Sequence, residues 1–409
     1  MNSIAYENNW LKKIILFLSS QTISLFGSSL VQYAIMWHIT LSSNSGGMMT
    51  IAIICGFLPT FFLSPFAGVW ADRYNRKLLI ILSDSMIAIA TLILAILFLL
   101  GYDSLWLLFV TSVVRSFGAG IQMPAVNAFI PQMVPEDMLT KVNSINGSIQ
   151  SFVTLISPMI SAALLTMTTI ELIFFIDVIT AMIALTILLF FLQVPVHAKA
   201  LQTKTGNYFV DLREGVAYIK NHDYVKRFFL FGAFFFFLAA PVAFLTPLQV
   251  IRSFGDDVWR LSAIEVVFSI GMLAGGMLMA LWGGLSNRIH TMALASFATG
   301  VFTFFLGSVP YFWIYLLFMG LTGIAMPIFN IPATVLLQEK VEGDYLGRVF
   351  GVLIMISTSM MPIGMLVFGP IADLIKIEWL LIGTGLLMSV ESFFLLGSKV
   401  LLEAGKAKH

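Results

Sequence analysis

The 409-residue chain is poor in charge, cysteine and histidine, and each scarcity excludes a class of protein. Charged residues make up 11% of the sequence, whereas a soluble domain carries roughly 25%. The single cysteine, Cys55, rules out a disulfide framework and a cysteine-based metal site. The five histidines are scattered, and the sequence has neither a Walker A phosphate loop nor a nucleophile–base pair. These absences predict a protein that is not an enzyme and holds no cofactor or metal.

Apolar residues account for 59% of the chain and come in long runs. A helix of about 20 apolar residues can cross a bilayer, so these runs predict an all-α membrane protein. The segment after Lys12 and Lys13 is too long for a secretory signal and is interpreted as the first membrane helix. The sequence predicts twelve spans, at residues 14–39, 47–70, 78–101, 104–129, 141–167, 170–193, 226–250, 260–284, 290–309, 311–337, 346–375 and 378–401.

The distribution of basic residues indicates how the chain is oriented in the membrane. An even number of spans places both termini on one side, and eighteen of the 22 lysines and arginines fall on that side. Arg252, Arg260 and Lys376 fall on the other side, and Arg115 falls inside a span. Because basic residues accumulate in cytoplasmic loops, we expect both termini to be cytoplasmic.

The chain divides into two similar halves. The sequence GIQMPAVN at residues 120–127 returns as GIAMPIFN at residues 323–330, at an offset of 203. We predict an N-terminal six-helix bundle at residues 1–193, a cytoplasmic linker at 194–225 and a C-terminal six-helix bundle at 226–409. Within the linker, residues 207–221 have the apolar spacing of an amphipathic helix. Such a helix either lies on the inner membrane surface or only tethers the two halves.

A short polar hinge separates the second and third spans and reads GVWADRYNRK at residues 68–77. This string resembles the loop between the second and third helices of major facilitator superfamily transporters, with Trp70 and Asn75 where that motif has Leu and Gly. A weaker copy, GGLSNR at residues 283–288, has Asn287 in place of the Asp. The alternative interpretation is an ordinary basic cytoplasmic loop.

The resemblance implies the major facilitator fold, with twelve transmembrane helices in two pseudo-symmetric six-helix bundles. Substrate would bind at mid-membrane between the bundles and be exposed to each side in turn. The hinge would then act as a cytoplasmic gate. We assign to this gate motif Gly68, Asp72, Arg73, Arg76, Lys77 and Asp84, the last of which lies about one turn inside the third span and is expected to brace the hinge.

Ionisable side chains inside spans are the candidates for proton coupling, because each costs at least about 2.5 kcal/mol at a helix centre unless it is paired or hydrated. Arg115 lies mid-span in RSFGAG, which resembles the fourth-helix motif whose arginine is linked to proton coupling in the same superfamily. Asp177 and Glu265 lie in the sixth and eighth spans, about 10 Å from the predicted outer edge. Burial of a carboxyl group favours its protonated form, so either acid could carry a proton inward. The alternatives are a structural hydrogen bond for Arg115 and solvated or capping roles for the two acids.

Uncharged polar residues inside spans are the candidates for substrate binding, because a site for amphiphilic compounds needs a few polar groups among apolar walls. They are Gln21, Gln32, Asn127, Asn146, Gln150 and Asn330. The alternative is that they form hydrogen bonds between helices.

Over nearly its whole length the chain is similar to bacterial macrolide-efflux proteins, a drug/proton antiporter branch of the superfamily. The similarity includes QTISL at residues 21–25, FLP at 57–59, GMLAGG at 271–276 and YLGRVF at 345–350, whereas the fifth span has Ser157 before Pro158 where the antiporter signature has Gly-Pro. It implies proton-coupled efflux of amphiphilic drugs such as macrolide antibiotics, and hence antibiotic resistance. We expect a monomer in a bacterial cytoplasmic membrane whose partners are the substrate, protons and lipids, and not nucleic acid. The alternatives are an exporter or flippase of lipids, siderophores or peptides, and a membrane protein that binds a ligand or confers immunity without transport.

Overall fold

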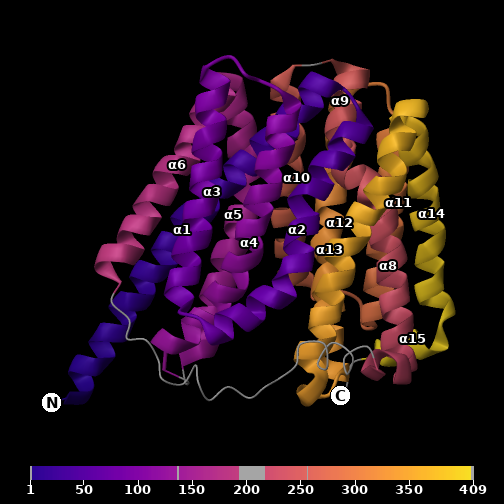
Figure 1. The fold of residues 1–409 in the computed structure, drawn as a ribbon. Helices are drawn as coiled ribbons and strands as arrows, with labels where there is room; N and C mark the ends of the chain where they lie inside the picture. The colour runs from indigo at the N-terminus through magenta and orange to yellow at the C-terminus, as the bar shows by residue number, and fades with distance from the viewer. Residues whose placement is uncertain (1, 136–137, 193–216, 256, 407–409) are drawn as a thin grey trace. The chain divides into compact units, whose positions relative to one another are not determined.

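The computed structural model describes residues 2–135, 138–192, 217–255 and 257–406 (Figure 1). Within these ranges twelve helical segments are long and apolar enough to cross a membrane, which confirms the predicted number of spans. No strand forms there apart from an isolated bridge between Asn287 and Lys406. The chain is therefore an all-helical, multi-pass membrane protein.

The two halves contain the following helices among the described residues. The first half contains α1 (Asn2–Ser43), α2 (Gly46–Arg73), α3 (Arg76–Leu99), α4 (Leu105–Met133), α5 (Leu139–Met167), α6 (Ile170–Thr186) and the π-helix η2 (Ile187–Phe191). The second half contains α8 (Asp223–Phe244), α9 (Thr246–Phe254), α10 (Val258–Trp282), α11 (Arg288–Ser308), α12 (Phe312–Lys340), α13 (Gly343–Leu374), α14 (Ile377–Gly397) and α15 (Lys399–Ala404).

Asparagine starts the helix after the hinge and the helix after its weaker copy. The Asn75 side chain accepts a hydrogen bond from the Leu78 backbone N–H at the start of α3. The Asn287 side chain accepts one from the Ile289 N–H at the start of α11, at 2.9 Å. A side-chain oxygen at this position satisfies one of the backbone donors that a helix leaves free at its N-terminus. An asparagine thus caps both helices, although Asn287 corresponds to Asp72 and not to Asn75 in the sequence pattern.

The seventh predicted span, at residues 226–250, is a broken helix in the structure. α8 ends at Phe244 and α9 begins at Thr246, with Leu245 between them. Proline has no backbone N–H to donate, so Pro241 and Pro247 each remove one hydrogen bond from this region. Two missing bonds so close together explain why the chain turns here instead of continuing as one helix.

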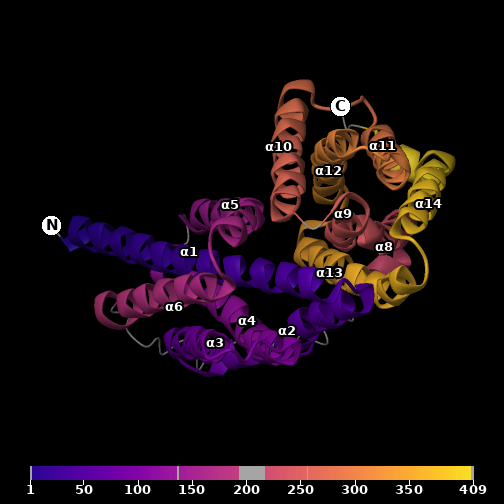
Figure 2. The ribbon, with the colours of Figure 1, turned by 90° about the horizontal axis from the view of Figure 1, so that it is seen from above.

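Contacts divide the chain into two compact units. The first comprises residues 1–39 and 51–205, and the second comprises residues 40–50 and 206–409. In the first unit α3 packs against α4 and α6, and in the second α11 packs against α12 and α14 (Figure 2). Most of the predicted linker lies outside the described residues, and of the predicted amphipathic helix only the helical residues 217–221 are described.

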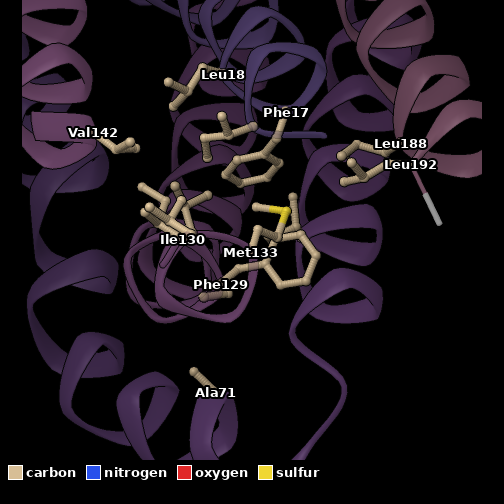
Figure 3. Close-up of a cluster of buried hydrophobic side chains, with 14 residues drawn as sticks. Phe17, Leu18, Ala71, Phe129, Ile130, Met133, Val142, Leu188 and Leu192 are labelled. Carbon is tan, nitrogen blue, oxygen red and sulfur yellow. The ribbon is translucent and has the colours of Figure 1, made fainter. Parts of the chain in front are cut away.

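A cluster of buried apolar side chains in the first unit lies near the hinge that joins α2 to α3. There the rings of Phe17 and Phe129 meet edge to face at 5.2 Å (Figure 3). We call this group the hinge-end cluster; it comprises Ile14, Phe17, Leu18, Ala71, Ile80, Ala125, Val126, Phe129, Ile130, Met133, Val134, Val142, Leu188 and Leu192. All of these side chains are buried and apolar, so this end of the unit is closed by a dry core.

The second unit is packed through glycines that bring helix backbones into contact. A Cβ atom on Gly385 of α14 would lie 2.5 Å from the Phe304 nitrogen of α11. A Cβ on Gly300 of α11 would lie 2.6 Å from the Ser389 nitrogen. Real Cβ atoms do not approach other atoms so closely. Because small residues allow close approach of membrane helices, α11 and α14 depend on glycine at these two positions.

Candidate functional site

A buried ion pair joins two helices of the first unit. In this pair, Nη1 of the Arg115 guanidinium on α4 lies 2.5 Å from Oδ2 of the Asp177 carboxylate on α6. The exposed fraction is 9% for the arginine side chain and zero for the aspartate side chain. The structure therefore pairs two residues that the sequence selects separately as charges within spans.

Two hydroxyl groups complete the coordination of this pair. Thr91 of α3 contacts both members, accepting from Arg115 and donating to Asp177 Oδ2 at 3.0 Å. Ser28 of α1 donates from its hydroxyl to Asp177 Oδ1 at 3.0 Å, and its backbone carbonyl accepts from Arg115 Nη2 at 2.9 Å. Gly27 allows this approach, because a Cβ there would lie 3.1 Å from the Asp177 Cα. We call Ser28, Thr91, Arg115 and Asp177 the ion-pair layer.

A second group of polar side chains lies nearer the hinge and contains an acid without a cation. Asp84 of α3 accepts a hydrogen bond through Oδ1 from Gln122 Nε2 of α4 at 2.6 Å. The same amide reaches Gln21 Oε1 of α1 at 3.4 Å. Asp84 is 2% exposed and Gln21 is 8% exposed. We call Gln21, Asp84 and Gln122 the amide layer.

The two layers are related by a regular spacing. On each of α1, α3 and α4, the residue of the amide layer and the residue of the ion-pair layer are seven positions apart. These pairs are Gln21 and Ser28 on α1, Asp84 and Thr91 on α3, and Gln122 and Arg115 on α4. Seven residues are close to two helical turns, or about 10 Å. The same three helix faces therefore build both layers, and α6 contributes Asp177 to only one of them.

The hydrogen bonding of the amide layer is incomplete. Asp84 Oδ2 and Gln21 Nε2 are buried and have no hydrogen-bond partner among the described residues. One is an acceptor and the other is a donor. The ion-pair layer is bonded at both carboxylate oxygens of its acid, so the two layers differ in how completely their acids are satisfied.

The hinge cations bind the ends of neighbouring helices. Arg76 donates to the backbone carbonyls of Ala71 in α2 and Ala128 in α4, each at 2.7 Å. Lys77 donates to the Leu192 carbonyl, just after η2, at 2.7 Å. The last carbonyls of a helix lack intrahelical partners and favour cations, which explains the contacts with Ala71 and Leu192. The side chains of Asp72 and Arg73, and the surroundings of Gly68, lie outside the described part of the structure.

Of the remaining predicted site residues, only Asn146 is buried. Asn146 and Gln150 lie on α5, with Gln150 half-buried. Gln32 on α1, Asn127 on α4 and Asn330 on α12 expose their side chains. Glu265 on α10 is half-buried, with no hydrogen bond or ion pair to any residue of the described ranges. The structure gathers Gln21 with Asp84 and leaves the other polar candidates without bonds to one another.

A polar cluster that the sequence analysis missed surrounds the turn between α1 and α2, within the second unit. The Asp373 carboxylate accepts from the backbone N–H groups of Gly46 and Gly47 at 2.8 and 2.9 Å, and from Ser45 Oγ at 2.7 Å. Arg252 of α9 bonds to Asp373 at 2.9 Å and to the Asn44 carbonyl at 2.7 Å. We call these six residues the turn cluster.

Three residues of the two layers, Ser28, Thr91 and Gln122, were not predicted as site residues, although their spacing in the sequence indicates them. Ser28, Thr91 and Gln122 are common polar residues, and each is unremarkable alone. Their spacing of seven from a polar residue already selected on the same helix would have identified them. Nothing comparable identifies the turn cluster, which joins positions up to 328 residues apart.

No group of three histidine, cysteine or acidic side chains suitable for a metal ion occurs in the described part of the chain. What the arrangement does provide is a pair of ionisable layers within a bundle of membrane-spanning helices. Twelve such helices, repeated in two halves, with ionisable groups buried among them, define a secondary transporter as the class of protein.

The chain belongs to the Major Facilitator Superfamily, whose sequence profile matches residues 14–365. It is 31% identical over 386 residues to Macrolide efflux protein A of Streptococcus pyogenes, covering 94% of this chain and 95% of that protein. It is also 31% identical over 323 residues to Macrolide efflux protein A of Enterococcus faecalis, covering 78% of this chain and all of that protein. Among solved structures, the nucleoside transporter NupG superposes with a TM-score of 0.68 at 17% identity, over 95% of this chain and 98% of that one. At that identity the superposition shows the fold alone.

Proposed function

We propose that the protein exports amphiphilic compounds, macrolide antibiotics first among them, in exchange for protons by alternating access. The choice of substrate rests on the similarity to two proteins named for macrolide efflux. The protein would act as a monomer in the bacterial cytoplasmic membrane with both termini inside, as the distribution of basic residues indicates.

The observation that carries the proton coupling is the buried contact between Arg115 and Asp177. Removing two charges from water costs several kcal/mol per ion, which their attraction offsets only with good geometry and further hydrogen bonds. The ion-pair layer supplies those bonds from α1, α3 and α4. A pair of this kind ties together helices that alternating access must move, so its charge balance is coupled to the conformation of the bundle. Glu265, on α10 of the second unit, is the other acid proposed for the coupling.

The hinge at residues 68–77 is proposed as the cytoplasmic gate. Arg76 and Lys77 hold the ends of α2, α4 and η2 through backbone carbonyls. Opening of the cytoplasmic side would require these bonds to break or to move together. Gly68, Asp72 and Arg73 complete the motif by the resemblance of its sequence, with Asp72 accepting from basic groups or helix N-termini.

The substrate site is proposed to use polar groups on the exposed faces of the helices. Gln32, Asn127, Gln150 and Asn330 are exposed or half-buried and are free to bind a ligand. Asn146 is buried, and Gln21 belongs to the amide layer, so both contribute through the shape and polarity of the wall. A few such groups among apolar side chains suit a large amphiphilic molecule.

The test is the accumulation of a radiolabelled macrolide by cells that express the protein, with and without a protonophore. The proposal expects lower accumulation than in control cells, and reversal of that difference by the protonophore. Asp177→Asn and Glu265→Gln then identify which acid the export requires. Unchanged accumulation with the protein present in the membrane would exclude macrolides, and the same assay would be repeated with lipids, siderophores and peptides. Ligand binding without export of any of these would favour a receptor or immunity protein.

A further inference from the structure

We propose that Asp84 is the residue that takes up and releases the transported proton, while Asp177 stays bound to Arg115 in the neighbouring layer. This inference rests on the proposed function, because it assigns the proton-carrying role within the same exporter. It departs from the sequence-based expectation, in which Asp177 or Glu265 carries the proton and Asp84 braces the hinge.

The charge balance of the two layers is the first argument. Among the described residues of the first unit, the buried charged residues are Asp84, Arg115 and Asp177. Arg115 is committed to Asp177 and to the Ser28 carbonyl. One acid is therefore in excess. A buried carboxylate without a cation costs several kcal/mol, and binding a proton removes that charge.

The surroundings of Asp84 show which charges it experiences. Gln122 donates to Asp84, the polar side chains of Gln21 and Ser24 lie near its carboxyl group, and Asp177 is the charge that acts on it. On its own helix, Lys77 lies seven residues away and is bonded to the Leu192 carbonyl. Arg76 is bonded to the carbonyls of Ala71 and Ala128. On α4 the nearest charge is Arg115, which is held by Asp177.

The amide layer has suitable hydrogen bonds for both protonation states. When Asp84 is ionised, Oδ1 accepts from Gln122, and the layer also holds an unpartnered acceptor, Asp84 Oδ2, and an unpartnered donor, Gln21 Nε2, which a rotation of the Gln21 side chain would bring together. When Asp84 is protonated, its O–H becomes a donor and Gln21 Oε1 becomes its acceptor. Rotation of one glutamine amide switches the layer between the two states. The ion-pair layer has no such freedom, because both oxygens of Asp177 already accept.

Access to Asp84 is closed in this conformation. Towards the hinge, the next buried apolar residues on α1, α3 and α4 are members of the hinge-end cluster, which includes Phe17, Ile80 and Phe129. In the other direction the ion-pair layer covers it. A proton can therefore reach or leave Asp84 only when the helices that bear these layers move, and such gating is what couples proton movement to transport.

The half-buried acids of the second unit are less suited to this role. As whole residues, Glu265 on α10 and Glu391 on α14 are partly buried, although both carboxylate oxygens of Glu391 are buried. Neither has a hydrogen-bond partner in the described part of the chain. Because neither acid is hydrogen-bonded to another helix, a change in its protonation would not alter any bond between helices. Asp84 is 2% exposed and its hydrogen-bonded layer spans three helices.

The experiment uses the full-length protein in proteoliposomes with radiolabelled erythromycin as the macrolide probe. With one proton exchanged per substrate, a pH difference of about one unit sustains about a tenfold concentration ratio. The wild type is expected to reach that ratio. Asp84→Asn is expected to lose the pH-driven accumulation and to keep the exchange of labelled for unlabelled erythromycin at equal pH. Ser83→Ala is the matched control, because this buried neighbour bonds only to carbonyls of its own helix.

The outcomes separate the two proposals. A wild type that neither accumulates nor exchanges erythromycin contradicts the proposed function. If the wild type accumulates erythromycin and Asp84→Asn accumulates it equally in response to the pH difference, the role of Asp84 is overturned and the proposed function stands. The role of Asp84 is also overturned if a folded Asp84→Asn protein has lost the exchange of labelled for unlabelled erythromycin as well as the accumulation.

A second measurement keeps the assignment testable if Asp84→Asn does not fold. Carbodiimides react with protonated carboxyl groups in apolar surroundings, so the wild type is treated with dicyclohexylcarbodiimide across a pH series and analysed by mass spectrometry. Labelling at Asp84 that increases as the pH falls is the expected result. Labelling of Asp177 or Glu265 with Asp84 unmodified at every pH would overturn the proposal.

Discussion

The two units share a repeat in sequence but are stabilised by different interactions. In the first, buried charges and amides connect α1, α3, α4 and α6. In the second, the buried polar residues of the described chain are uncharged. At the offset of 203 that relates the halves, Arg115 and Gln122 correspond to Phe318 and Ala325. Phe318 stacks on Phe305 with ring centroids 4.7 Å apart.

This difference teaches that a duplicated bundle can keep its fold while the chemistry of its halves diverges. Packing of apolar helices requires only volume and small residues at close contacts. Buried charge carries an additional cost and is retained where it serves a function. The buried ion pair lies in the first unit, and Phe318 in the second unit provides the matched uncharged position.

The largest effect is expected from removing one member of the ion pair. Arg115→Leu leaves Asp177 buried without its cation and should lower the free energy of unfolding by about 3–5 kcal/mol. Thermal unfolding in detergent measures this loss. The double variant Arg115→Leu, Asp177→Leu should recover much of it, because no charge is then left unpaired.

The corresponding position in the second unit is the control. Phe318→Leu removes only part of a half-buried ring and should cost about 1 kcal/mol. Equal losses for Arg115→Leu and Phe318→Leu would show that the buried charge is of no special structural importance.

The next effect tests the glycine contacts of the second unit. Gly385→Ala places a Cβ 2.5 Å from the Phe304 nitrogen and should destabilise the protein by about 1–3 kcal/mol. Gly383→Ala, on the same helix, meets open space and should change little. Unfolding temperatures of the two variants make the comparison, and similar values would show that α11 and α14 can separate without cost.

A smaller effect is expected at the turn cluster. Asp373→Asn removes the charge that accepts from the first backbone N–H groups of α2 and from Arg252. Loss of a helix cap costs about 1 kcal/mol. Asp257→Asn is the control, because it breaks a pair with Arg260 within one exposed turn, and such pairs contribute about 0.5 kcal/mol or less. An Asp373→Asn protein as stable as Asp257→Asn would argue against a stabilising role for the cluster.

The smallest effect compares the hinge with its copy. Asn287 donates its amide to the Leu402 carbonyl of α15 at 2.9 Å, a bond that an aspartate cannot make. Asn287→Asp keeps the helix cap and should cost about 0.5 kcal/mol. We expect faster hydrogen exchange in α15, with Ser286→Ala as the exposed neighbour that leaves it unchanged. Unaltered exchange in α15 would mean that the amide does not hold it.

Much of the fold follows from the sequence because membrane spans are long and apolar. The predicted spans coincide with the helices, and Arg115 and Asp177 are evident as charges among apolar residues. Their pairing depends on how α4 and α6 pack, which no local pattern encodes. Asp84 was assigned to the hinge because it lies near the hinge in the sequence, whereas its contacts are with α1 and α4. The break at Leu245 follows from Pro241 and Pro247, and the apolar pattern of the span does not reveal it because the span stays apolar across the break.

The turn between α1 and α2 has a consequence for dividing the protein. Residues 40–50 belong to the second unit by their contacts, although the chain on either side of them belongs to the first. The boundary between the units is therefore not a single point in the chain, and a cut in the linker does not release two self-contained halves. A separately produced C-terminal half would lack the segment that Asp373 and Arg252 bind. If the two halves were co-expressed as separate chains, the hydrogen bonds of Asp373 and Arg252 to residues 44–47 would join them non-covalently. Reassembly of the split protein would then depend on these bonds.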